Sequence, residues 1–308
     1  MHRVPVPFRS LFLGGGLFLM TSATLVYSPA ADAQSLQPLA QLESLHLDTS
    51  KVGRVTAYFE PTDRIRAEEL ATLSENASAF FERELGIEFE LGVAALSPEH
   101  WFSEFPNIPY AIPWPSMPDK LIFMPSSLRE GLLIQGPTEL ADRRRVDFVL
   151  LHEYGHIAAK AYFRPADDRD YLTVKWFEEL LATYFAYAFV RASDSAWATA
   201  ARDAWRSEVQ RYTPAELSLD WSFMNDLPGD ELARTYAWYQ FMLNLRAAEI
   251  YDQHGIRFLE MLQEQLPWLE ADDWNTAVVL PLLEEIAPGF EAWEASLPGM
   301  GGKRHDDH

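Results

Sequence analysis

Apolar and polar residues follow different patterns in the two parts of this chain. Residues 52–59 read as a strand, residues 87–93 alternate strictly between apolar and polar, and 121–124 is a further short apolar run. Residues 63–85 carry apolar side chains at helical spacing up to Gly86, a frequent helix terminator. After residue 140 nearly every segment has helical spacing. Strands followed by helices predict an α+β fold.

This order predicts a division into two packed parts. We expect residues 34–145 to form an N-terminal subdomain, a small mixed β-sheet layer with a helix. Residues 146–297 should form a mainly helical subdomain that carries the chemistry described below. Residues 298–308 have the composition of a disordered tail.

The run 146–161 (VDFVLLHEYGHIAAKA) is apolar on nearly every face, which indicates a buried helix. It contains His152, Glu153 and His156 in the pattern H-E-x-x-H. Histidines four residues apart project from one face of a helix, so both rings can bind one metal ion, and the glutamate can act on water bound to that metal. The alternative is a pair of hydrogen-bonded core histidines. A metal would satisfy all three buried polar groups at once.

A catalytic zinc ion needs a third protein ligand, and the helical run 174–191 offers two adjacent acids, Glu178 and Glu179. Glu179 shares its face with the small Ala182, which would allow a close crossing with the first helix at Gly155. We therefore favour Glu179 as the ligand and keep Glu178 as the alternative. Two solvated acids at a helix start are the competing interpretation.

With Glu179-x-x-Ala182-x-Tyr184 on the second helix, residues 146–190 resemble the gluzincin zinc peptidases of the peptidase MA clan, in particular small secreted members with one catalytic domain. The resemblance implies a zincin-like fold and one Zn²⁺ per chain, bound by His152, His156 and Glu179, with Glu153 as general base. It also implies an edge strand above the metal that holds an extended substrate, which would fall within residues 108–125.

Two further expectations follow from the resemblance. The aminopeptidase branch carries a G-x-M-E-N segment that residues 105–140 do not contain, so endopeptidase activity is slightly preferred over exopeptidase activity. Related enzymes stabilise the oxyanion with a tyrosine from a later helix. The helical run 231–250 contains Tyr236, which matches that position better, and Tyr239. Both also fit an ordinary core role.

The amino terminus has the features of a signal peptide: basic residues, an apolar stretch at 11–27 and an A-x-A site that predicts cleavage after Ala33. An uncleaved anchor is the alternative. We expect export to the periplasm or the exterior, without stable membrane insertion after cleavage. The chain has no cysteine, which excludes disulfides, cysteine zinc sites and cysteine nucleophiles.

The formal charge of −21 argues against nucleic acid and anionic membranes as partners. The sequence therefore predicts an exported zinc metallopeptidase, a hydrolase whose partner is a peptide or protein substrate. The alternative is a non-catalytic zinc-binding or interaction protein that retains the gluzincin fold.

Overall fold

The computed structural model describes residues 42–105, 113–126, 142–163, 174–214, 217–219, 227, 229–266 and 274–298. The predicted signal peptide and nearly all of the predicted tail lie outside the described residues. No helix in the described ranges is both long and apolar enough to cross a bilayer.

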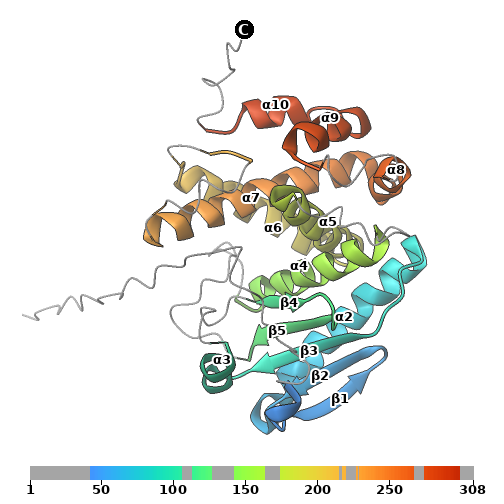
Figure 1. Ribbon diagram of the computed structural model, residues 1–308, viewed down its shortest axis with the longest axis vertical. Helices are drawn as coiled ribbons and strands as arrows, with labels where there is room; N and C mark the ends of the chain where they lie inside the picture. The colour runs from blue at the N-terminus through green and yellow to red at the C-terminus, as the bar shows by residue number, and fades with distance from the viewer. Residues whose placement is uncertain are drawn as a thin grey trace, which may run out of the picture.

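A five-stranded mixed sheet forms the base of the molecule, with the strand order β1-β2-β3-β5-β4 (Figure 1). β2, β3 and β5 run parallel, whereas β1 pairs with β2 and β4 with β5 in antiparallel fashion. The strands are β1 (Asp48–Val52), β2 (Val55–Phe59), β3 (Leu91–Leu96), β4 (Trp114–Ser116) and β5 (Leu121–Pro125).

Two predicted strands differ in extent from the observed ones. The run 52–59 is interrupted by a turn at Gly53, whose φ of +57° favours glycine, and so contributes to both β1 and β2. The run 87–93 alternates in burial, but its pairing begins only at Leu91, opposite Val55. Its neighbour β2 begins at Val55, and residues 87–90 therefore have no strand partner.

Helices account for most of the rest of the described chain. A 3₁₀ turn, η1 (Pro61–Asp63), precedes the first long helix. The helices are α2 (Arg64–Leu85), α3 (Pro98–Glu104), α4 (Asp142–Tyr162), α5 (Lys175–Ser193), α6 (Ser195–Arg211), α7 (Gly229–His254), α8 (Arg257–Gln265), α9 (Thr276–Ile286) and α10 (Phe290–Ala295). The predicted coarse α+β class, a small N-terminal sheet followed by helices, is confirmed.

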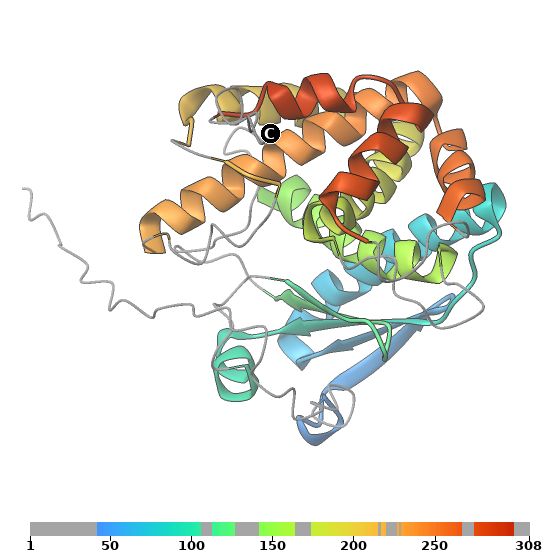
Figure 2. The same ribbon diagram turned by 45° about the horizontal axis from the view of Figure 1, so that its top comes forward.

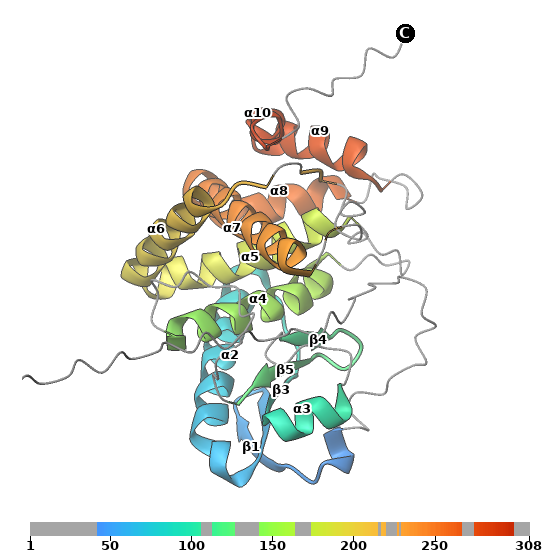
Figure 3. The same ribbon diagram turned by 90° about the vertical axis from the view of Figure 1, so that its left-hand side faces the viewer.

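Apart from α3, the helices lie on one face of the sheet in successive layers. α4 lies above the sheet, α5 packs on α4, and α7 packs on α5, while α9 and α10 lie farthest away (Figures 1 and 3). The view in Figure 2 shows this helical lobe covering one face of the sheet. α2 connects β2 to β3 and packs against both strands and α4.

Alternate residues of the strands serve two apolar clusters. Val93 and Ile122 face the helices and join a large core that reaches from β2 to α10. Ala94 and Phe123 face the other way and pack with Trp101 of α3 in a small second cluster. Residues from both predicted subdomains thus share the large core, which fixes α4, α5 and α7 relative to the sheet.

Candidate metal centre

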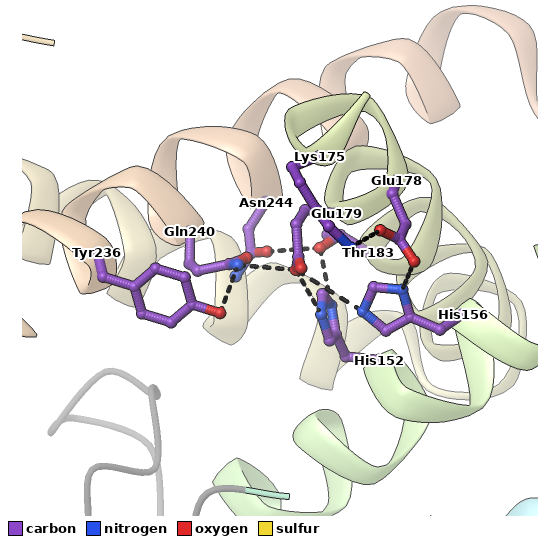
Figure 4. Close-up of polar contacts among 9 residues, drawn as sticks. All are labelled: His152, His156, Lys175, Glu178, Glu179, Thr183, Tyr236, Gln240 and Asn244. Atoms are coloured by element: carbon purple, nitrogen blue, oxygen red, sulfur yellow. Dashed lines mark hydrogen bonds and ion pairs between the residues drawn. The ribbon is translucent and has the colours of Figure 1, made fainter. Parts of the chain in front are cut away.

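Three side chains from two helices converge at the crossing of α4 and α5 (Figure 4). His152 and His156 come from α4, and Glu179 comes from α5. One potential ligand atom from each lies within 4.8 Å of the others. Glu179 Oε2 is 3.1 Å from His152 Nε2 and 3.7 Å from His156 Nε2. The three are close enough to hold one metal ion.

The adjacent acid, Glu178, takes a different position. Its Oε1 lies 3.7 Å from Nδ1 of His156, on the side of the ring away from Glu179, and its Oε2 is 2.7 Å from Lys175 Nζ (Figure 4). Glu179 therefore faces both Nε2 atoms, whereas Glu178 faces one Nδ1 atom.

A glycine allows the two helices to approach this closely. A Cβ atom at Gly155 would lie 2.1 Å from the backbone oxygen of Ala182, far inside van der Waals contact. The close crossing that the sequence predicted at Gly155 and Ala182 is thus present. It brings the Glu179 carboxylate, one helical turn before Ala182, to the imidazole rings.

A hydrogen-bond chain fixes the orientation of His152. Thr183 Oγ1 donates to Asn244 Oδ1 at 2.9 Å, and the same oxygen lies 3.1 Å from His152 Nδ1. Because the hydroxyl proton of Thr183 is given to Asn244, the hydroxyl oxygen accepts from Nδ1–H of His152. In the neutral ring this leaves the Nε2 lone pair directed at Glu179, as a metal ligand requires.

The carboxylate of Glu179 is held by α7. The buried Gln240 donates from Nε2 to Glu179 Oε2 at 2.8 Å and to Tyr236 Oη at 3.2 Å. Tyr236, Gln240 and Asn244 are spaced four residues apart, so they form one polar stripe on α7 that faces the cluster (Figure 4).

Three of these polar residues were not predicted from the sequence: Thr183, Gln240 and Asn244. A signal for two of them was present, since amides four and eight residues after Tyr236 interrupt an apolar helix on one face. Of the two candidate tyrosines, Tyr236 lines the cavity beside the cluster, whereas Tyr239 is 2% exposed within the core.

Burial and charge set the protonation of the cluster. Burial raises the pKa of Glu153 to about 8, and the nearby Glu179 and Glu178 add to the shift, while His152 opposes it. Burial lowers the pKa of His156 to about 4. Burial alone would raise the pKa of Glu179, but His156 and His152 outweigh it and hold that pKa at about 2.

Burial lowers the pKa of His152, but the hydrogen bond to Glu179 and the charge of Glu179 raise it by more. The net result is a pKa above the ordinary value for histidine. A proton and a metal ion therefore compete for the His152 ring, and metal binding would displace the proton. An anionic carboxylate and a neutral His156 are the protonation states that metal binding needs.

These side chains open onto a cavity of about 350 Å³. It is lined by the cluster with Glu153, by the polar stripe of α7, by Lys175 and Glu178 of α5, and by an apolar wall. The apolar wall consists of Pro113, Trp114, Pro115, Met117, Phe148 and Val149.

The edge strand β4, whose three residues line this cavity in part, carries a backbone acceptor that faces away from β5. Gly92 N donates to Lys120 O, and Ser126 N donates to Leu96 O, so even-numbered residues of β5 bond to β3. The backbone N–H and C=O of Ile122 therefore point toward β3 and away from β4. Ile122 and its β4 partner Pro115 thus form a non-hydrogen-bonded pair. The Pro115 carbonyl faces away from the sheet, without an N–H beside it.

A scan of protein-family models finds no match to the chain, and a search of curated proteins finds none either.

Proposed function

We propose that this chain is an exported zinc-dependent peptidase with a zincin-like fold of the gluzincin type. The observation that carries the proposal is the convergence of His152, His156 and Glu179 within 4.8 Å. Two imidazole nitrogens and one carboxylate oxygen are a ligand set typical of catalytic zinc, which leaves one position for water or substrate. His156 Nδ1 is also buried without a hydrogen bond, and Glu178 lies 3.7 Å away on that side.

Zinc bound there would supply Lewis acidity, lowering the pKa of water and polarising a substrate carbonyl. Glu153 would take the proton from the attacking water and deliver it to the departing amine. Glu153 lines the same cavity as the three proposed ligands, as a general base must. Tyr236 on the α7 wall would donate a hydrogen bond to the developing oxyanion.

The cavity walls suit an extended peptide. The Pro115 carbonyl could accept one main-chain N–H of a substrate beside β4, while the apolar wall receives side chains. We propose internal cleavage of peptides or proteins, because a main-chain contact beside β4 would not require a free terminus of the substrate.

The alternative is a non-catalytic zinc or interaction protein that keeps this fold. Glu153 weighs against it, since a purely structural site fills all four zinc positions with protein ligands and needs no base. Burying a fourth ionisable group beside the three ligands costs free energy that catalysis would justify.

Glu153→Gln tests the proposal. The variant should retain about one zinc per chain and lose roughly 10²- to 10⁴-fold in kcat, because only the proton acceptor is removed. Zinc is measured by elemental analysis and cleavage by digestion of a peptide library with and without chelator. Glu99→Gln, on the exposed face of α3, is the matched control and should behave as wild type.

Three outcomes would distinguish a zinc peptidase from the alternatives. Undiminished cleavage by Glu153→Gln would eliminate Glu153 as the base. A wild-type protein that binds zinc but cleaves no peptide in the library would favour the non-catalytic alternative. A protein that stays zinc-free in added zinc would overturn the metal assignment itself.

A further inference from the structure

Gln240 lies between Glu179 and Tyr236 and lines the cavity. It is 4% exposed and lies in the middle of α7, where an amide without partners would be destabilising. Its Nε2 lies 2.8 Å from Glu179 Oε2 and 3.2 Å from Tyr236 Oη. A single nitrogen thus bridges a ligand carboxylate and a phenol.

The chemistry of the amide fixes the direction of both contacts. An amide nitrogen carries two hydrogens and accepts no hydrogen bond, so Gln240 donates to both partners. Glu179 Oε2 receives one of these bonds, and it is also the oxygen that faces Nε2 of His152 and His156. Tyr236 Oη receives the other, so the phenol proton is not used toward Gln240.

We infer that Gln240 is a positioning residue that sets the spacing between the metal ligand Glu179 and the Tyr236 hydroxyl. The inference rests on the proposed peptidase function for the role of Tyr236, but the bridging itself does not. Donation to Glu179 holds the carboxylate toward the two rings. Donation to Tyr236 Oη fixes the phenol and strengthens it as a donor, because linked hydrogen bonds polarise one another.

The helix makes this coupling rigid. Tyr236 and Gln240 are one turn apart on α7, and α7 packs directly on α5, which carries Glu179. Asn244, one turn further, holds Thr183 beside His152. A single face of α7 therefore supports two of the three proposed ligands, and the two bonds of Gln240 connect one of them to Tyr236.

The first measurement is zinc affinity, determined by competition with a chromogenic chelator. Gln240→Met keeps the side-chain length but removes both donors, and it should weaken zinc binding roughly 10- to 100-fold. Tyr236→Phe should leave zinc binding within about twofold of wild type. Gln263→Met is the matched control, because Gln263 on α8 donates to the backbone oxygen of Tyr162, away from the cluster.

The second measurement reports on Tyr236 without requiring activity. A single 3-fluorotyrosine is placed at position 236, and its ¹⁹F resonance is recorded. The resonance should shift in Gln240→Met and stay in place in Gln263→Met. If Gln240→Met fails to fold by circular dichroism, Gln240→Leu replaces it, since it also removes both donors and introduces no ionisable group.

The third measurement is a double-variant cycle on zinc-saturated protein, with a peptide found by library digestion. Tyr236→Phe and Gln240→Met should each lower kcat with little change in KM. Adding Gln240→Met to Tyr236→Phe should lower kcat by no more than about twofold further, because the phenol it positions is already gone.

Two results would overturn the inference: wild-type zinc affinity in Gln240→Met, or an unmoved ¹⁹F resonance. Full additivity in the cycle would remove the catalytic part of the role. If the zinc-loaded wild type cleaves no peptide, the proposed function fails, whereas the zinc and fluorine measurements still decide whether Gln240 bridges the two groups.

Discussion

Each proposed ligand of the cluster has a polar neighbour that is not itself a ligand, hydrogen-bonded for His152 and Glu179 and 3.7 Å away for His156. Thr183 contacts His152, Glu178 lies near His156, and Gln240 donates to Glu179. Such neighbours orient ligand atoms and tune their basicity, so their loss weakens a metal site without abolishing it. The difference between losing a ligand and losing its support can be measured.

Glu179→Ala and Glu178→Ala should therefore differ in zinc retention. Glu179→Ala removes one of three ligands, and we expect it to lose zinc on dialysis. Glu178→Ala removes the neighbour of His156 Nδ1, and we expect a drop in zinc affinity of roughly 10- to 100-fold. Zinc content after dialysis against a weak chelator checks both. Loss of zinc from Glu178→Ala alone would show that the two acids have been assigned in the wrong order.

The raised pKa of Glu153 predicts a pH dependence of stability in chelator. Its carboxyl has an ordinary pKa of 4.5 when unfolded and about 8 when folded. Between these values only the folded state holds the proton, so the free energy of unfolding falls as pH rises, by up to about 1.4 kcal/mol per pH unit.

Glu153→Gln removes the carboxyl group that binds this proton. Denaturant unfolding at pH 5 to 8 should show a shallower decline in stability for the variant than for wild type. The raised pKa of His152 acts in the same direction, and the charge of Glu153 contributes to that shift, so its loss in the variant also makes the decline shallower. Identical slopes would mean that Glu153 ionises in the folded protein at its ordinary pKa.

At the scale of elements, the site depends on how closely α4 and α5 cross. Gly155→Ala places a Cβ 2.1 Å from the backbone oxygen of Ala182. A backbone atom cannot avoid the clash by changing rotamer, as a side chain could. We expect a loss of about 1–3 kcal/mol in stability from overpacking, despite the higher helix propensity of alanine, and weaker zinc binding as Glu179 moves away.

Gly86→Ala is the comparison for this prediction. Gly86 ends α2 with φ of +68°, and a Cβ there meets nothing within 4 Å. Its substitution should cost about 1–2 kcal/mol through backbone conformation and leave zinc affinity unchanged. Thermal melts and zinc titrations of both variants separate the two effects. Unaltered zinc affinity in Gly155→Ala would refute the dependence of the site on this crossing.

The helices of the site were predictable because they are apolar on nearly all sides and carry the motif residues. The predicted runs 146–161 and 231–250 fall inside α4 and α7, and the run 174–191 falls inside α5 apart from Val174, the N-cap residue. Strand limits were not predictable to the same degree, because alternation in 87–93 does not specify which residues find a partner strand. β4 has three residues and a proline, too little to show any alternation.

The site residues divide in the same way. His152, His156 and Glu179 were identified because spacing on a helix constrains which side chains share a face. Thr183, Gln240 and Asn244 were missed because their roles arise from the packing of α7 on α5, a contact between segments about sixty residues apart. No local pattern encodes which helices pack together.

At the scale of the whole molecule, metal binding should stabilise the entire fold. The ligands lie on α4 and α5, which belong to the single large core that links the sheet to α10, so the metal-binding geometry requires that core to be formed. A ligand that binds only the folded state adds RT ln(1 + [L]/Kd), or about 2.7 kcal/mol at a free concentration of 100 Kd. For a chain of this size that corresponds to a rise in Tm of about 4–5 °C.

Calorimetry of chelator-treated protein, with and without added Zn²⁺, tests this expectation. Wild type should show the full rise in Tm, and Glu179→Ala should show little at the same zinc concentration, because two histidines alone bind the ion more weakly. Mg²⁺ should leave the Tm unchanged, since it prefers octahedral oxygen ligands to imidazole. An equal rise with Mg²⁺, or in Glu179→Ala, would place the stabilising ion elsewhere on this acidic chain and detach the three-residue cluster from metal binding.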